Sequence, residues 1–260
     1  SWLALVWPFS LALVIHSSTN RFRRIFFFVL ASSIVVALIM TDSRNAWGGL
    51  LLGIPFVLGH IQWPWLLPLM VLLFIPVALA ILPGVGLEIQ ELSRKIVPEG
   101  LWSRLNDMRY INERSLASTR ISQWSVALRL VLEKPFLGWG AAAFSVLYPL
   151  RTGIWHGHSH NLPLELAVSH GTIVSILIVS NVIALIIASF RYTIWLNNIN
   201  RNNDSNVIDR AWWTSTFILL CLHGADIPLF DSRINIAGWI LLAGLKCLLD
   251  EKKKITFVYS

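Results

Sequence analysis

Apolar residues gather along the chain in seven long runs, separated by short polar segments and by one long polar segment. The runs are Trp2–Ile15, Ile25–Met40, Ala46–Ile61, Trp65–Leu82, Leu162–Phe190, Ala211–Ala225 and Ile234–Leu249. About 20 predominantly apolar residues are enough to cross the hydrocarbon core of a bilayer as an α-helix. The pattern therefore predicts an all-α fold, a polytopic transmembrane helical bundle.

The composition agrees with a membrane protein and excludes an ordinary soluble domain. Of the 260 residues, 55% are hydrophobic and 13% are charged, whereas soluble domains carry about a quarter charged residues. The thirteen Trp and thirteen Phe suit the aromatic belts at membrane interfaces. The basic residues behind the net charge of +7 lie between apolar runs, so they report topology rather than nucleic-acid binding. The two cysteines, Cys221 and Cys247, fall inside apolar runs and form no disulfide framework or metal motif.

The first apolar run begins at Trp2 with no basic segment ahead of it and no small-residue cleavage site after it. It is therefore not a signal peptide. We interpret it as the tail of a membrane span, and the chain as the C-terminal part of a larger bundle. The expected organisation is transmembrane helices at 1–83 with the first one truncated, an extracytoplasmic loop or cap at 84–160, transmembrane helices at 161–250, and a cytoplasmic tail at 251–260.

Basic residues in short loops predict the orientation of the bundle, because such loops are enriched in Lys and Arg on the cytoplasmic side. Arg21, Arg23 and Arg24 place the loop before the second run in the cytoplasm. Counting spans from there puts Arg191–Arg210 and Lys252–Lys254 on the same side, and both segments are basic, as the rule expects. The predicted layout is therefore self-consistent.

The same count brings many charged residues to the extracytoplasmic side. They come from four separate parts of the chain: Asp42, Arg44, Arg109, Arg114, Arg120, Arg129, Arg151, the histidines at 156, 158 and 160, Asp226, Asp231 and Arg233. Charged groups at the ends of membrane helices mark a functional site by default, because they are costly there without a partner, water or a substrate.

The long polar segment has helical patterns of its own. Ser118 and Thr119 can cap a helix at Arg120–Glu133, which carries an apolar stripe. Lys134 and Pro135 end that helix, and a tight turn is expected at 138–140. A second short helix is expected at Leu87–Ile96. We interpret the whole segment as a partly helical cap on the membrane surface.

The histidines before the fifth run are the strongest candidates for chemistry. His156, His158 and His160 alternate, so on an extended strand they would share a face and could bind zinc. Hydrated interfacial side chains are the alternative for His156 and His158. His160 stands at a helix start, with Asn161 and Glu165 sharing a face of that helix. A neutral His beside an acid is suited to act as a general base or to donate to a phosphate.

Three other groups have both a structural and a functional reading. Arg44 can extend its charge to the membrane surface or pair with Asp42, or it can bind a ligand. Arg120, at a helix start, is either a solvated surface residue or a fork for a phosphate. Asp231 and Arg233 either pair with each other or contribute to a site with Asp226.

Three motifs resemble the O-antigen ligase and polymerase superfamily of bacterial membrane glycosyltransferases. The stretch Ser43-Arg44-Asn45-Ala46-Trp47 resembles a motif that opens a span. Arg120-x-x-x-Trp124 followed by Pro135-x-x-Gly138-x-Gly140 is similar to the loop motif of the family. His158-Ser159-His160-Asn161, with Glu165 and Gly171, resembles its His-Asn motif. The segment at 223–235 is most similar to the cyanobacterial branch once labelled inorganic-carbon transporters.

The resemblance implies a specific reaction. A glycan on an undecaprenyl diphosphate carrier is the donor, and the acceptor is a hydroxyl of a lipid, such as the lipopolysaccharide core, a polysaccharide or a protein. Arg44 and Arg120 would bind the diphosphate, His160 would take the acceptor proton, and Glu165 would orient His160. The remaining substrate-binding residues would be His158, Asn161, Asp226, Asp231 and Arg233. No cofactor or metal is implied, because arginines supply the counter-charge.

The sequence also fits two alternatives to a ligase. A polysaccharide polymerase of the same superfamily shares these motifs. A transporter for a small anion such as bicarbonate would explain the extracytoplasmic arginines as a vestibule. Such a transporter would also place ionisable groups near the bilayer midplane, and the centres of these apolar runs contain almost none. The expected location for either enzyme is the bacterial plasma membrane, with the active face outside.

Overall fold

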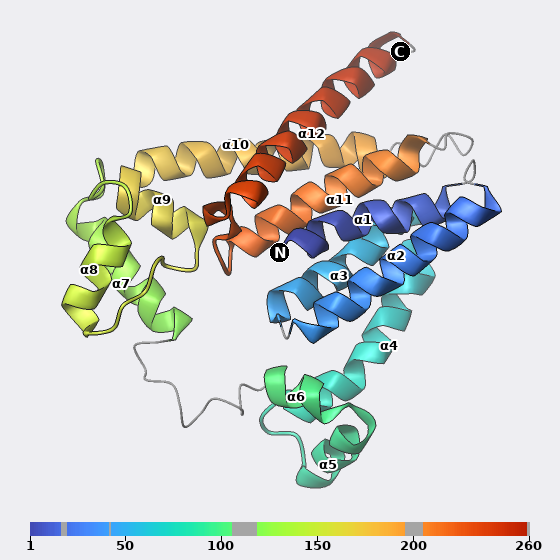
Figure 1. Ribbon diagram of the computed structural model, residues 1–260, viewed down its shortest axis with the longest axis horizontal. Helices are drawn as coiled ribbons and strands as arrows, with labels where there is room; N and C mark the ends of the chain where they lie inside the picture. Colours follow the sequence, from blue (N-terminus) through green and yellow to red (C-terminus); the bar gives the residue numbers. More distant parts are fainter. Residues whose placement is uncertain (17–19, 42, 106–118, 196–204, 259–260) are drawn as a thin grey trace.

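The computed structural model describes residues 1–16, 20–41, 43–105, 119–195 and 205–258 (Figure 1). Four residues named above, Asp42, Arg109, Arg114 and Ser118, lie outside the described residues. Regular structure in these described ranges is helical throughout, without a strand. The all-α prediction is confirmed.

The helices follow the apolar runs and the predicted cap helices. They are α1 (Trp2–Ile15), α2 (Arg21–Met40), α3 (Arg44–Leu58), α4 (Trp63–Ile81), α5 (Leu87–Ile96), α6 (Glu99–Leu105), α7 (Arg120–Glu133), α8 (Ala143–Thr152), α9 (Leu162–His170), α10 (Thr172–Phe190), α11 (Ser205–His223) and α12 (Ser232–Val258). Among the described residues, four stretches are long and apolar enough to cross a membrane: Arg21–Met40, His60–Ile81, Thr172–Trp195 and Ser232–Lys254. The polytopic membrane architecture therefore has direct support.

Helix α1 lies inside the bundle, against α2, α3 and α11 (Figure 1). Close approach depends on small residues of α3, since a Cβ on Gly53 would lie 2.9 Å from Trp7 Nε1. Buried polar groups in this core have backbone partners: Trp7 Nε1 donates to Leu50 O at 3.3 Å, and Ser215 Oγ donates to Leu5 O at 2.7 Å. Small residues at helix crossings and such interhelical hydrogen bonds are typical of membrane bundles.

The outer faces of α2, α4 and α10 are strongly apolar and exposed. Phe28 of α2, Leu73 of α4 and Ile176 of α10 keep 60%, 67% and 65% of their surface accessible. A soluble monomer rarely exposes a continuous apolar surface of this kind. These faces are therefore suited to contact with lipid.

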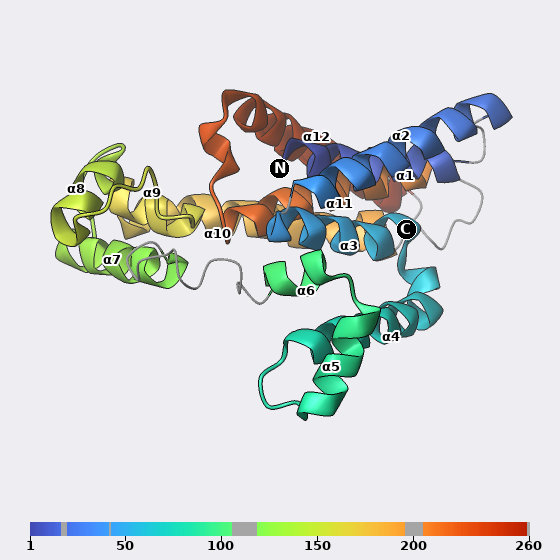
Figure 2. The ribbon, with the colours of Figure 1, turned by 60° about the horizontal axis from the view of Figure 1, so that its bottom comes forward.

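The described helices of the segment at 84–160 lie in two places rather than in one cap. Helices α5 and α6 lie against α4, while α7 and α8 pack on α9 (Figure 2). Both helices expected here from the sequence, Leu87–Ile96 and Arg120–Glu133, have the predicted bounds. Thr119 caps α7 as expected, since its Oγ1 accepts from Ser122 N at 3.3 Å.

The fifth apolar run is not one helix. It breaks at Gly171 into α9 and α10, which fold back on each other, with Ser175 Oγ donating to Pro163 O at 2.7 Å. Gly171 has φ +88°, and a Cβ there would lie 1.9 Å from Phe136 O. The break is therefore a tertiary effect: the segment after α7 occupies the space that a side chain would need.

That segment forms a backbone joint with the α9–α10 corner. Trp139 N donates to Val168 O at 2.7 Å, Gly140 N donates to Ser169 O at 3.0 Å, and Thr172 N donates to Pro135 O at 2.7 Å. Gly138, at φ +65°, lies so close that a Cβ would be 2.7 Å from Ser169 O. Gly138 of the second motif and Gly171 of the third motif thus lie in the same backbone contact. We refer to these contacts between 135–140 and 168–172 as the corner joint.

Candidate functional site

The charged segments that the sequence assigned to the extracytoplasmic side gather at one end of the bundle. In both Figure 1 and Figure 2, the starts of α3, α9 and α12 and the end of α11 lie at this end, with α7 and α8 beside them. This is the arrangement expected from counting spans.

His160 and Asp226 form the centre of the candidate site. His160 precedes the N-cap of α9 and has a left-handed backbone, with φ +53°. Its Nδ1 lies 3.0 Å from Oδ1 of Asp226, in the loop between α11 and α12. Both side chains are partly exposed, at 29% and 39%. A non-glycine residue in this conformation is uncommon, and such residues cluster at active sites and ligand-binding sites.

The protonation of this pair follows from its surroundings. Burial raises the pKa of Asp226, but the hydrogen bonds from His160 and Ile227 N and the nearby imidazoles bring that pKa below its ordinary value. Asp226 is therefore ionised near neutral pH and only accepts. The proton between the two residues then belongs to Nδ1 of His160. In the neutral imidazole this leaves Nε2 as a proton acceptor.

His158 supports the backbone and ring of His160. Its Nδ1 accepts from His160 N at 3.2 Å, and the two rings meet edge to face with centroids 4.2 Å apart. On its other side His158 stacks on Phe230, at 5.3 Å. Burial and the neighbouring His160 lower the pKa of His158, so its neutral form predominates near neutral pH.

Asn161 joins α9 to the end of α11. Its Oδ1 caps α9 by accepting from Leu164 N at 3.0 Å, and its Nδ2 donates to Gly224 O at 3.0 Å. The one side chain thus begins a helix and ties that helix to the loop that carries Asp226. In this structure Asn161 is a scaffold residue of the site.

Glu165 holds the histidine loop by its backbone. The residue is 5% exposed, and its Oε2 accepts from Ser159 N at 2.9 Å. Burial raises the pKa of Glu165, although the hydrogen bonds from Ser159 oppose this. The carboxylate on the ring of His160 is Asp226, which the sequence assigned to substrate binding. Glu165 therefore acts on His160 one residue away, through the loop.

Asp231 and Arg233 pair with each other at the start of α12. Arg233 Nη2 lies 2.8 Å from Asp231 Oδ2, and Arg233 Nε lies 3.1 Å from Oδ1. The Arg233 guanidinium lowers the pKa of Asp231. This is the local pairing weighed above from the sequence, and it keeps both groups charged near the His160–Asp226 pair.

Arg44 and Arg120 are each the first residue of a helix. Ser43 Oγ accepts from Ala46 N at 3.4 Å at the start of α3, and Thr119 caps α7 in the same way. Both arginines are of intermediate exposure. The helix starts that carry them lie at the site end of the bundle (Figures 1 and 2), where an N-terminus favours an anion.

The zinc alternative takes a different form in the structure. His158, His160 and Asp226 each offer a ligand atom, and these atoms lie within 4.8 Å of one another. His156, the third histidine of the sequence pattern, instead packs edge to face on Tyr148 at 5.5 Å. Histidine and carboxylate ligands suit zinc, so this group is the one a metal would use.

The pairing of His160 with Asp226 is what the sequence did not reveal. The two residues are 66 positions apart, so no local spacing relates them. Phe230 as a platform for His158 was missed for the same reason. The only available signal was the prediction that both segments lie on one membrane side.

Comparison with known proteins gives one match. A family model described as O-Antigen ligase matches residues 29–179, more than half of the chain. The matched region includes the motifs around Arg44, Arg120 and His160 and ends before Asp226. No curated protein and no solved structure matches the chain.

Proposed function

Because the chain belongs to the O-antigen ligase family, we propose that it transfers a glycan from an undecaprenyl diphosphate carrier to an acceptor hydroxyl. The reaction takes place on the extracytoplasmic face of the bacterial plasma membrane and needs no metal. The observation that carries this proposal is the 3.0 Å contact between His160 and Asp226 at the end of a membrane bundle.

His160 is the general base. Asp226 accepts from Nδ1 and so fixes the tautomer in which Nε2 is free to take a proton. The acceptor hydroxyl gives its proton to Nε2 as its oxygen forms a bond to the anomeric carbon of the donor sugar. Asp226 then stabilises the imidazolium. A positioned base of this kind contributes about 10²–10⁴ in rate.

Arg44 and Arg120 bind the diphosphate. As the bond between the anomeric carbon and the diphosphate oxygen breaks, its electron pair leaves with the diphosphate. Guanidinium groups match phosphate oxygens with two parallel hydrogen bonds and stabilise the charge that develops on the leaving group. Helix starts under both arginines add a favourable field. The arginines thus supply the charge that a divalent ion supplies in other transferases.

The other predicted residues shape the acceptor side. His158 and the ion pair of Asp231 with Arg233 present polar groups beside the base, and Asn161 keeps the loop of Asp226 against α9. The segment at 84–160 covers this extracytoplasmic end in part through α7 and α8, while 1–83 and 161–250 supply the membrane helices and 251–260 faces the cytoplasm.

Two substitutions separate the roles of base and diphosphate ligand. His160→Ala should abolish transfer while the lipid-linked donor still binds, because a base acts in the transition state. Arg44→Lys keeps the charge but loses the two-pronged geometry, so it should weaken donor binding as well as rate. Donor binding and glycan transfer by purified variants measure both effects.

His156→Ala is the matched control, since His156 packs on Tyr148 and takes no part in the proposed chemistry. It should keep most of the transfer activity. Transfer by His160→Ala at near the wild-type rate would show that this end of the bundle is not the catalytic centre.

A further inference from the structure

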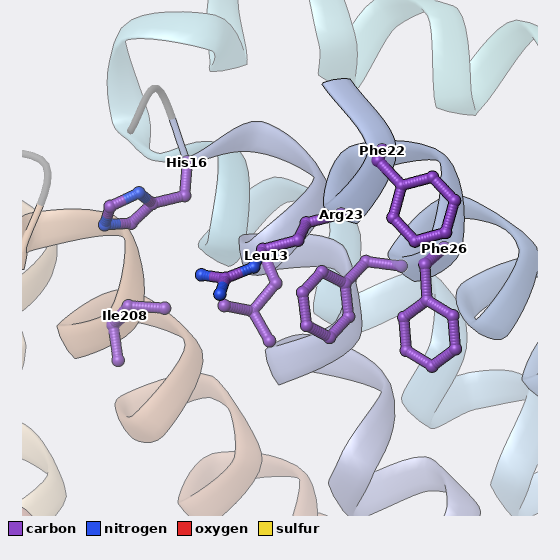
Figure 3. Close-up of a pocket in the computed structure, with 7 residues that line it drawn as sticks. Leu13, His16, Phe22, Arg23, Phe26 and Ile208 are labelled. Carbon is purple, nitrogen blue, oxygen red and sulfur yellow. The ribbon is translucent and has the colours of Figure 1, made fainter. Parts of the chain in front are cut away.

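A pocket of about 520 Å³ lies at the opposite end of the bundle from His160. The end of α1, the first turns of α2 and the start of α11 form it (Figure 3). Its volume is within the range of about 300–1,000 Å³ that small-molecule sites occupy. The chemistry proposed above does not use this pocket.

The pocket combines an aromatic wall with a basic edge. Figure 3 shows Phe22 and Phe26 together on one side, and His16 and Arg23 with their nitrogen atoms turned toward the space above Ile208. Phe22 is 81% exposed and Phe26 58% exposed. One side of the pocket thus suits an acyl chain, while the other suits an anion.

More positive charge surrounds this edge. Arg21 and Arg24 flank the pocket residues on the first turn of α2, and all the arginines of this turn are exposed. Arg24 Nη2 donates to His16 O at 3.4 Å, so the turn is held against the end of α1. Asn20 caps the helix by accepting from Arg23 N at 2.9 Å. The cationic group is therefore carried on an ordered helix start.

The position of the pocket indicates where a ligand comes from. Helix α2 is one of the candidate membrane spans, and the arginines stand at its first turn. The pocket therefore lies at the level of lipid headgroups. Basic clusters directly beside a membrane span attract anionic lipids, with about fivefold in affinity for each Lys or Arg.

We infer that this pocket binds an anionic phospholipid, with the phosphate on Arg23 and His16 and an acyl chain along Phe22 and Phe26. A lipid matches both halves of the pocket, whereas a soluble phosphate would use the basic edge alone. Since this end also carries the arginine-rich loop expected in the cytoplasm, the lipid belongs to the cytoplasmic leaflet.

The test is lipid binding to the purified full chain in detergent, followed by native mass spectrometry. Phosphatidylglycerol should bind more tightly than phosphatidylcholine. Arg23→Gln should lower the affinity for phosphatidylglycerol about fivefold and leave phosphatidylcholine unchanged. Arg191→Gln is the matched control, because Arg191 is also exposed and stands at the same end of the bundle, but outside the pocket. It removes the same charge, so it should lower the affinity for phosphatidylglycerol clearly less than Arg23→Gln does.

Phe26→Ala keeps every charge and provides the second variant, should Arg23→Gln fail to fold. It should weaken binding of phosphatidylglycerol by removing part of the acyl wall. Equal losses for Arg23→Gln and Arg191→Gln, or no loss for either pocket variant, would overturn the site. Displacement of the lipid by glycerol phosphate at matching concentration would overturn the lipid assignment, because the acyl chain would then add nothing.

Discussion

At the scale of single residues, two carboxylates, those of Asp226 and Glu165, hold His160 in position. Asp226 contacts the ring of His160, while Glu165 holds the backbone of the preceding Ser159. Burial raises the pKa of both acids, but at Asp226 the hydrogen bonds from His160 and Ile227 N and the nearby imidazoles together outweigh burial, so the two pKa values move in opposite directions. Asp226 therefore stays ionised near neutral pH, whereas burial disfavours the anionic form of Glu165.

Glu165→Gln should change how stability depends on pH. Because the pKa of Glu165 is raised in the fold, its contribution is present below about pH 4.5 and is lost as pH rises through the folded-state pKa. Glutamine stays neutral and can still accept from Ser159 N. The variant should therefore gain in free energy of unfolding relative to wild type as pH rises, by at most about 1.4 kcal/mol per pH unit.

Unfolding of the purified chain by denaturant between pH 4 and pH 8 measures this effect. Glu133→Gln is an informative control, because the Arg151 side chain lowers the pKa of Glu133 and the sign of the pH effect reverses. Parallel pH profiles for wild type and Glu165→Gln would contradict the role of burial at this carboxylate.

Transfer activity should survive EDTA. In the mechanism proposed above, the arginines supply the counter-charge for the diphosphate, and the Oδ1 atom of Asp226 already accepts from His160. The measurement is glycan transfer by the purified protein before and after chelation. Loss of transfer that zinc restores would make His158, His160 and Asp226 metal ligands and would end the assignment of His160 as a base.

At the scale of elements, the corner joint explains why two of the family motifs stand where they do. The glycines at 138 and 171 allow the backbone after α7 to touch the backbone between α9 and α10. Helix α7, which begins with Arg120, is thereby fixed to α9, which begins after His160. The motifs thus carry positioning as well as chemistry.

Gly171→Ala should break this joint. Its Cβ would lie 1.9 Å from Phe136 O in a backbone with φ +88°, and neither backbone can give way cheaply. We expect a loss above about 4 kcal/mol or failure to fold. Gly100→Ala is the control, since no atom lies within 4 Å of its Cβ and alanine favours a helix by up to about 1 kcal/mol. Thermal unfolding compares them, and similar melting temperatures would contradict the joint.

Elements with a local cause could be predicted from the sequence, and those with a tertiary cause could not. The bounds of α7 follow from Thr119 as its cap and from Pro135 after its end. The division at Gly171 depends on Phe136, which an isolated run of apolar residues cannot reveal. The same holds for Asp226, which the sequence assigned to substrate binding with no sign of its contact with the ring of His160.

At the scale of the whole molecule, the two ends of the bundle are held in different ways. Near His160 the contacts are hydrogen bonds across loops. At the other end Lys252 of α12 pairs with Asp209 of α11 at 2.8 Å, and Arg210 Nε donates to Val57 O at 2.9 Å. Residues 251–258, assigned from the sequence to a tail, continue α12, because Lys252 holds that helix against α11.

Labelling in intact cells tests the orientation of the whole bundle. In a background without Cys221 and Cys247, Arg129→Cys on α7 should react with a membrane-impermeant maleimide. Lys253→Cys on α12 should react only after the membrane is permeabilised. Both positions are exposed, so access to the thiol depends on the side of the membrane. The reverse pattern would invert the proposed active face.

The distance in sequence between His160 and Asp226 has a consequence for biosynthesis. When the ribosome has released the chain as far as α10, every family motif is already present, but the acid partner of His160 has not been made. Both α10 and α11 must be made before Asp226, in the loop after α11, can reach the imidazole. A product truncated before residue 226 would therefore carry the three family motifs but lack the carboxylate that contacts the imidazole of His160. The chemistry proposed above for the lipid-linked donor therefore waits until α11 and the loop after it have been made.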